Sequence, residues 1–254
     1  MRALRRAVLL GAFALALVGP SAARAADPEA LWKIVHGHCV PVAQSGNGGK
    51  PAPCEVVNLY GHYVVLKDIV GATQYLVLPT DRIEGIEDPA LLAPGARNYW
   101  ADAWQARRFV ADGAGKPIPR QDISVAVNSQ KGRSQNQLHF HVDCVRADVR
   151  DVLAAQEATI GPDWRPLGVP LAGHDYLVMR LVAPQLGDLD PFKLLAEKLP
   201  AAAADMGDRT LVLVGAHFRD GADGFYLLTD HADLAKRDRA SGEELQDHDC
   251  KVLK

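Results

Sequence analysis

Polar and apolar side chains alternate most regularly near the middle of the chain, at residues 137–144. Successive side chains of a β-strand point to opposite faces, so this alternation predicts a half-buried strand. One face carries apolar residues and the other polar ones: Leu138, Phe140 and Val142 against Gln137, His139, His141 and Asp143. The two histidines therefore point the same way. A pair of imidazoles is not needed to fill a core, so this face is the first candidate for chemistry.

Similar patterns predict the other elements. Apolar, β-branched runs predict strands, and two pairs of them form hairpins around glycine-containing turns. The predicted strands cover residues 63–69, 74–79, 123–128, 176–182, 211–217 and 225–229. Apolar positions at helical spacing predict helices between Asp27 and Gly37 and at residues 98–113, 148–160 and 191–204. Residues 45–53 and 81–95 are predicted to be mainly loop.

This order of elements predicts an α+β fold in which helices pack on an antiparallel sheet. A chain of 254 residues is long enough for one domain, or for a core domain with a second lobe. We expect residues 26–160 to form the catalytic core and residues 161–254 to form a smaller C-terminal α+β lobe packed on it. Trp100 and Trp104 lie on one stripe of a predicted helix and are expected in the core, with stacking on a base as the alternative.

The N-terminus has the pattern of a targeting segment. Basic residues precede an apolar run at residues 7–18, and Ala23-Arg24-Ala25 follows as a small-x-small cleavage pattern. The run of twelve residues is short, because about 20 are needed to cross a bilayer as a helix. We therefore predict export, with residues 1–25 as a signal peptide or, if uncleaved, an N-terminal membrane anchor.

The charge pattern narrows the partners. The net charge is −3 with both signs interspersed, and no basic run follows the first six residues. This argues against a nucleic-acid partner, which would require a basic patch. A small or lipidic partner fits the sequence better.

Export changes how the four cysteines are interpreted. In an oxidising compartment an even number of cysteines favours disulfides, and four allow three pairings. Cys39 and Cys54 flank a loop rich in glycine and proline, so we pair them and leave Cys144 with Cys250. Four free buried thiols are the alternative. A zinc site is less favoured because no Cys-x-x-Cys occurs.

The histidine strand resembles the histidine triad signature, in which histidines alternate with apolar residues. The motif here is Gln137-Leu-His139-Phe-His141-Val, with glutamine in the first histidine position. In that superfamily the middle histidine attacks the α-phosphorus of a nucleotide, and the register assigns this role to His139. The resemblance also implies that Asn128 and Ser134 bind phosphate, and Gln74 occupies a second position that usually holds histidine.

Within that superfamily the chain is most similar to the bacterial CDP-diacylglycerol pyrophosphatase family. The shared segments include residues 63–68, 104–107, 128–129, 135–136, 173–174 and 246–250. The resemblance implies hydrolysis of CDP-diacylglycerol to CMP and phosphatidate without a cofactor or metal. It also implies a location at the periplasmic side of the inner membrane, with a membrane surface as partner. Whether residues 1–25 are cleaved or retained as a membrane anchor is left open.

The residues support this chemistry. Histidine, with an ordinary pKa of about 6.5, is a suitable nucleophile when a carbonyl fixes its tautomer, and a nucleotidyl group on His139 would then be cleaved by water. We expect His141 to contact a phosphate oxygen or the leaving group. Uncharged donors suit the non-bridging oxygens, and the candidates are Asn128, Ser134, Gln137 and Gln74. Arg133 is either a phosphate contact or a solvated turn residue.

Two other functions use the same face. His139, His141 and Asp143 alternate as three metal ligands could, which would make the protein a metal-dependent phosphohydrolase. A non-catalytic periplasmic carrier of nucleotide or lipid would bind at this face without turnover. His174 is a further candidate for the site, although a structural role is favoured.

Overall fold

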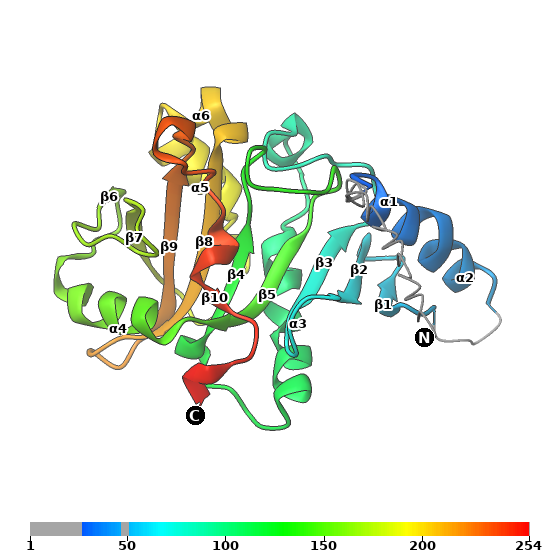
Figure 1. Ribbon diagram of the computed structural model, residues 1–254, viewed down its shortest axis with the longest axis horizontal. Helices are drawn as coiled ribbons and strands as arrows, with labels where there is room; N and C mark the ends of the chain where they lie inside the picture. The colour runs from blue at the N-terminus through cyan, green and yellow to red at the C-terminus, as the bar shows by residue number, and fades with distance from the viewer. Residues whose placement is uncertain (1–26, 47–50, 254) are drawn as a thin grey trace, which may run out of the picture.

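The computed structural model describes residues 27–46 and 51–253, and its centre is one large antiparallel sheet (Figure 1). In the described part of the chain the sheet has ten strands, in the order β1-β2-β3-β5-β4-β8-β9-β7-β6, with β10 paired to the end of β5. The strands are β1 Cys54–Asn58, β2 Tyr63–Lys67, β3 Tyr75–Pro79, β4 Ile123–Val127, β5 Phe140–Val145, β6 Arg165–Pro166, β7 Leu177–Val182, β8 Arg209–His217, β9 Asp223–His231 and β10 Gln246–Asp247. The predicted α+β class with an antiparallel sheet is confirmed.

Helices cover both faces of this sheet. They are α1 Ala30–Ile34, α2 Val40–Gln44, α3 Tyr99–Ala114, α4 Ala147–Gln156, α5 Pro191–Lys198 and α6 Ala202–Asp205. A π-helical segment, Val35–Cys39, joins α1 and α2 into one N-terminal helical region, residues 30–44. The face beneath α3 holds the largest apolar core, where Trp100 packs edge-on against Phe140 with ring centroids 5.1 Å apart. Both tryptophans of α3 are fully buried, as predicted for core residues.

The opposite face is covered in three parts. The α1–α2 region packs on β1–β3 through Val35 and Cys39, and α4 packs at the other side through Val149 and Leu153. Between them the C-terminal segment, residues 240–250, crosses in front of β4 and β5 (Figure 1). The prediction of a half-buried strand left the polar face of β5 open to solvent. In the structure this face is instead enclosed by protein.

Specific contacts hold the C-terminal segment in place. β10 pairs with the end of β5, and the amide of Gln246 donates to the backbone oxygen of His141 over 3.0 Å. The amides of Ala72 and Thr73 donate to the backbone oxygen of His248. A Cβ on Gly71, whose φ is +67°, would lie 2.3 Å from the Cβ of His248. Only glycine permits this turn to adopt its conformation and the segment to approach so closely.

Both predicted disulfides are confirmed: Cys39 is bonded to Cys54, and Cys144 to Cys250. The alternative of four free thiols is therefore wrong. One disulfide fastens the N-terminal helical region to the edge strand β1. The other fastens the end of the C-terminal segment to β5.

Some predicted boundaries are wrong, for identifiable reasons. The first helix does not end at Gly37 but continues to Gln44, because burial of Val35 and Cys39 against the sheet outweighs the low helix propensity of glycine. The helix predicted at residues 191–204 breaks into α5 and α6, because Pro200 disfavours helical geometry at the residue before it. Asn98 precedes α3 but caps nothing, and its amide donates to the backbone oxygens of Gly187 and Leu189.

The C-terminal half does not form a sheet of its own. β4 pairs with β5 on one side and with β8 on the other, so residues 161–254 extend the same sheet. The predicted second lobe is not confirmed, and the division at residue 160 stays a prediction. The predicted leader, residues 1–25, lies outside the described residues. Within the described ranges, no helix combines the length and apolar character that crossing a bilayer requires.

Candidate active site

A cavity of about 370 Å³ lies over the polar face of β5, between the N-terminal helical region and the C-terminal segment. Its lining divides into two chemical parts. The polar part includes Asn128, Ser134, Gln135, His139, His141 and Glu243. The apolar part includes Leu31, Ile34, Leu66, Ile69, Val70 and Leu76. This division suits a ligand with a charged group and an apolar portion.

His139 lies just before β5, and the backbone fixes its ring. Its Nδ1 donates to the backbone oxygen of Gln137 over 2.6 Å, so its Nε2 carries a lone pair. Burial lowers the pKa of His139 below the ordinary 6.5, although the bond to Gln137 acts in the opposite direction. The expected hydrogen bond from the ring to a backbone carbonyl is present. His139 is therefore a neutral imidazole with one unprotonated nitrogen.

His141 faces the same cavity, with its ring centroid 4.8 Å from that of His139. The amide nitrogen of Gln74 donates to Nδ1 of His141 over 2.8 Å, which leaves the ring proton on Nε2. Burial lowers the pKa of His141, so its ring too is neutral. Gln74 thus orients His141 from behind and does not line the cavity, where we had expected it to contact substrate.

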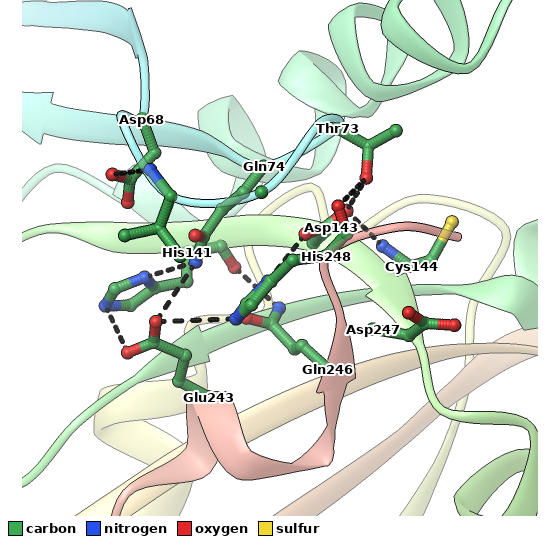
Figure 2. A network of polar contacts seen from close by, with 12 residues as sticks. Asp68, Thr73, Gln74, His141, Asp143, Cys144, Glu243, Gln246, Asp247 and His248 are labelled. Atoms are coloured by element: carbon green, nitrogen blue, oxygen red, sulfur yellow. Dashed lines mark hydrogen bonds and ion pairs between the residues drawn. The ribbon is translucent and has the colours of Figure 1, made fainter. Parts of the chain in front are cut away.

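Glu243 lines the same cavity as the two histidines and brings its carboxylate to His141, as Figure 2 shows. One carboxylate oxygen, Oε2, lies 3.5 Å from Nε2 of His141 and accepts a hydrogen bond from the Asn128 amide over 3.1 Å. Burial acts against ionisation of Glu243, but His141, the amides of Asn128 and Gln74, and then His248 outweigh it and hold the pKa of Glu243 below its ordinary 4.5. An ionised carboxylate therefore faces neutral His141.

A second histidine–carboxylate pair supports Glu243 from the side opposite His141 (Figure 2). His248 lies between Asp143, whose Oδ2 is 2.8 Å from its Nδ1, and Glu243, whose Oε1 is 3.6 Å from its Nε2. The bond to Asp143 raises the pKa of His248, against the effect of burial. The other oxygen of Asp143 accepts hydrogen bonds from the Thr73 hydroxyl and the Cys144 amide. Asp143 is thus fully buried and fully engaged.

The remaining predicted substrate contacts divide into two groups. Asn128 and Ser134 line the cavity as expected. The Gln137 amide instead donates to the backbone oxygens of Pro79 and Asp81, and Arg133 forms an ion pair with Glu87 at 2.6 Å. Neither side chain lines the cavity. Their positions give no support to the expected phosphate contacts.

The three residues of the metal alternative do not converge. Asp143 turns to Thr73 and His248, and the groups of converging ligand atoms found in the described part of the chain do not include His139 or His141. One such group, Asp143, Cys144 and Cys250, contains the disulfide. The other is His174, Asp230 and Glu244, away from the cavity. His174 Nδ1 lies 2.8 Å from Glu244 Oε1, so His174 supports the segment that carries Glu243 and does not enter the site.

Glu243 and His248 are site residues that the sequence did not predict. Both lie in a segment of mostly irregular backbone, more than 100 positions from His139, and no periodicity relates them to the histidine strand. One signal was available. Residues 246–250 belong to the segments shared with the family, and the predicted bond between Cys144 and Cys250 already brings this segment to the end of the histidine strand.

Comparison with known proteins gives a consistent result. A family model described as CDP-diacylglycerol pyrophosphatase matches residues 26–254. The CDP-diacylglycerol pyrophosphatase of Yersinia pestis is 46% identical over 230 residues, which cover 91% of this chain and 87% of that protein. The similarity therefore includes both halves of the sheet and the C-terminal segment.

Proposed function

Because the chain belongs to the CDP-diacylglycerol pyrophosphatase family, we propose that its cavity binds CDP-diacylglycerol and that His139 attacks the cytidylyl phosphorus. The protein is a hydrolase of this phosphoric anhydride, and the products are CMP and phosphatidate. The observation that supports His139 as nucleophile is its hydrogen bond to the backbone oxygen of Gln137. That bond fixes the ring and leaves Nε2 unprotonated in the cavity lining.

The reaction then has two steps. Nε2 of His139 forms a bond to the cytidylyl phosphorus, and the bond from that phosphorus to the bridging oxygen breaks to release phosphatidate. Because Nδ1 keeps its proton, the nucleotidyl-histidine is an imidazolium, which is a good leaving group. Water attacks the same phosphorus in the second step and loses one proton, the phosphorus–nitrogen bond breaks with its electrons returning to Nε2, and CMP leaves with the neutral ring restored.

The other polar lining residues stabilise the charge that develops on phosphorus. The proton on Nε2 of His141 and the amide of Asn128 are donors in the cavity, and Ser134 adds a hydroxyl. Loss of one such preorganised donor costs roughly 3–4 kcal/mol of transition-state stabilisation in other enzymes. This arrangement also supports a histidine triad-like assignment, with Gln74 and His141 taking up the positions around the nucleophile.

The apolar part of the cavity is suited to the lipid portion of the substrate. α1 contributes Leu31 and Ile34 to that wall, and the β2–β3 turn contributes Ile69 and Val70. Residue 30 is only four positions after residue 26, a distance of at most about 14 Å of extended chain. We therefore propose that the protein works at the periplasmic face of the inner membrane, with the leader of residues 1–25 bringing this wall close to the lipid surface.

The test is rapid-quench analysis of CDP-diacylglycerol labelled in the cytidine. Wild-type protein is expected to release CMP and to carry a transient, acid-labile nucleotidyl group on His139. His139→Ala is expected to be folded, by circular dichroism, and to lose both the adduct and turnover. CMP release by folded His139→Ala would contradict the mechanism. Activity that is lost with EDTA and restored by zinc would favour a metallohydrolase. Binding of the substrate by the wild-type protein without CMP release would favour a carrier.

A further inference from the structure

Glu243 is an unexpected group in a cavity that binds a pyrophosphate. Its carboxylate lies against His141 and Asn128, the groups proposed to contact phosphate. An ionised carboxylate repels a phosphate anion, and its partial burial carries a desolvation cost. Asp68 also lines the cavity, but its Oδ1 accepts from the amide of Val70 in its own turn. Glu243 is thus the lining carboxylate that faces the histidines.

The surroundings hold this carboxylate in the ionised form and in a fixed direction. Amides of Asn128 and Gln74 approach different oxygens of Glu243, at 3.1 and 3.4 Å. Its backbone amide donates to Oδ1 of Asn128 over 3.2 Å. His248, paired with buried Asp143, lies next to it on the side opposite His141 (Figure 2). Contacts on several sides thus fix the Glu243 carboxylate, although its desolvation and its repulsion of phosphate are unfavourable. A chemical role would explain why it is there.

The proposed mechanism contains one step that needs a base. In the first step His139 is already neutral and phosphatidate leaves as a phosphate anion, so no proton has to be removed. In the second step the attacking water must lose a proton as it bonds to phosphorus. His139 cannot accept it, because its Nδ1 is protonated and its Nε2 is bonded to phosphorus. His141 is a weak acceptor, because its Nδ1 is occupied by the Gln74 amide and its Nε2 carries a proton.

We infer that Glu243 is the base that removes a proton from the water that hydrolyses the nucleotidyl-His139 intermediate, and that His248 and Asp143 position it. This inference rests on the proposed function. The water oxygen bonds to the cytidylyl phosphorus, one water proton passes to the carboxylate, and the electrons of the broken phosphorus–nitrogen bond return to Nε2 of His139. The proton then leaves Glu243 for solvent when CMP departs. Glu243 is a catalytic residue of the second step only.

Glu243→Gln tests this role, because it keeps the shape and removes the base. We expect a fast release of phosphatidate close to one equivalent per enzyme, followed by turnover slowed by roughly 10²-fold or more, the usual range for loss of a general base. Labelled nucleotide should accumulate on His139. Fluoride carries no proton and needs no base, so its attack on the intermediate should restore turnover of Glu243→Gln. The product would be cytidine 5′-phosphorofluoridate.

Glu244→Gln is the matched control. Glu244 is the next residue in the same segment, but it contacts His174 and Tyr176 and does not line the cavity. It should show no accumulated adduct. If Glu243→Gln does not fold, Glu243→Asp replaces it. This variant keeps a carboxylate on a shorter side chain, so it should retain part of the second-step rate.

The outcomes separate the two proposals. Turnover of folded Glu243→Gln near the wild-type rate, or slow turnover without a phosphatidate burst or adduct, would overturn the role of Glu243. Neither result would affect the nucleophile, which the His139→Ala comparison tests separately. If His139→Ala is folded and active, the covalent mechanism itself is wrong.

Discussion

A histidine that attacks phosphorus must be unprotonated at the working pH, and at His139 burial has this effect. His139 is 7% exposed, and burial lowers the pKa of its ring below 6.5. As the pH falls through 6.5 an ordinary imidazole would gain a proton, but His139 stays neutral until the pH falls further. Neighbouring His141 and Glu243 also have lowered pKa values, so neither adds a loss of activity near pH 6.5.

We therefore predict that kcat/KM stays level as the pH falls through 6.5 and declines only below it. The quantity to measure is kcat/KM on a soluble short-chain substrate, because it reports the pKa values of the free enzyme. Titration of the His139 ring by NMR provides the independent check. An acidic decline centred at or above pH 6.5, matched by the ring titration, would contradict the effect of burial.

For single residues, the sequence predicts the backbone position better than the direction of the side chain. Alternation put His139 and His141 on one face, which is where they lie. Gln137 belonged to the same pattern, but it lies three residues before β5 begins at Phe140, whereas His139 adjoins the strand, so alternation no longer determines where Gln137 points. Arg133 was undecided because its partner, Glu87, is 46 positions away and no local pattern predicts their ion pair.

Among the elements, the C-terminal segment has the largest effect on the site, because it carries both Glu243 and His248. Regular structure contributes little to its position, since β10 has two residues. The Cys144–Cys250 disulfide fixes its end beside Asp143, while Cys39–Cys54 fixes the N-terminal helical region. Loss of the first disulfide should therefore affect the chemistry and loss of the second should not.

We predict that Cys144→Ser/Cys250→Ser lowers kcat on a soluble short-chain substrate by roughly 10²-fold, the usual effect of a small misplacement of catalytic groups. Cys39→Ser/Cys54→Ser is the control and should keep kcat close to wild type. Stability should fall in both. The closed loops span 106 and 15 residues, for which chain entropy gives about 4.7 and 3 kcal/mol. Urea unfolding measures that difference, and an unchanged kcat in folded Cys144→Ser/Cys250→Ser would show that the disulfide does not align the site.

Regular elements were predictable because each depends on a local period. The β2–β3 and β8–β9 hairpins and α3 follow directly from patterns along the chain. The contribution of the C-terminal segment depends instead on single contacts, such as the backbone oxygen of His248 against the turn at Gly71. Such contacts leave no periodic signal, which explains why Glu243 and His248 were not predicted as site residues.

For the whole molecule, the pairing of β4 with β8 decides the architecture. A sequence predicts strands but not which of them are neighbours, so the hairpin β8–β9 was expected in a lobe of its own. The pairing instead makes one sheet, in which β5 carries His141, with His139 just before it, near the middle. The cavity over β5 consequently has the N-terminal helical region and the β2–β3 turn on its apolar side.

The β2–β3 turn has the features of a contact with lipid. Ile69 is 99% exposed and Val70 is 48% exposed, and both also line the apolar side of the cavity. Fully burying an aliphatic side chain of this size is worth roughly 1.5–3 kcal/mol. We propose that these two side chains enter the lipid surface, so that the diacylglycerol portion of the substrate reaches the cavity without crossing water.

We predict that Ile69→Ser/Val70→Ser weakens binding to vesicles containing CDP-diacylglycerol by about tenfold or more, given that burial energy. Turnover of vesicle-bound substrate should fall in parallel, while kcat on a soluble short-chain substrate should stay at the wild-type value because the histidines are untouched. Val182→Ser is the matched control, since Val182 is 63% exposed but lies at the end of β7, well away from the cavity. Vesicle sedimentation and the two assays measure these effects. Equal losses on both substrates would assign the turn to the chemical site, and equal vesicle binding by all variants would exclude it as the lipid contact.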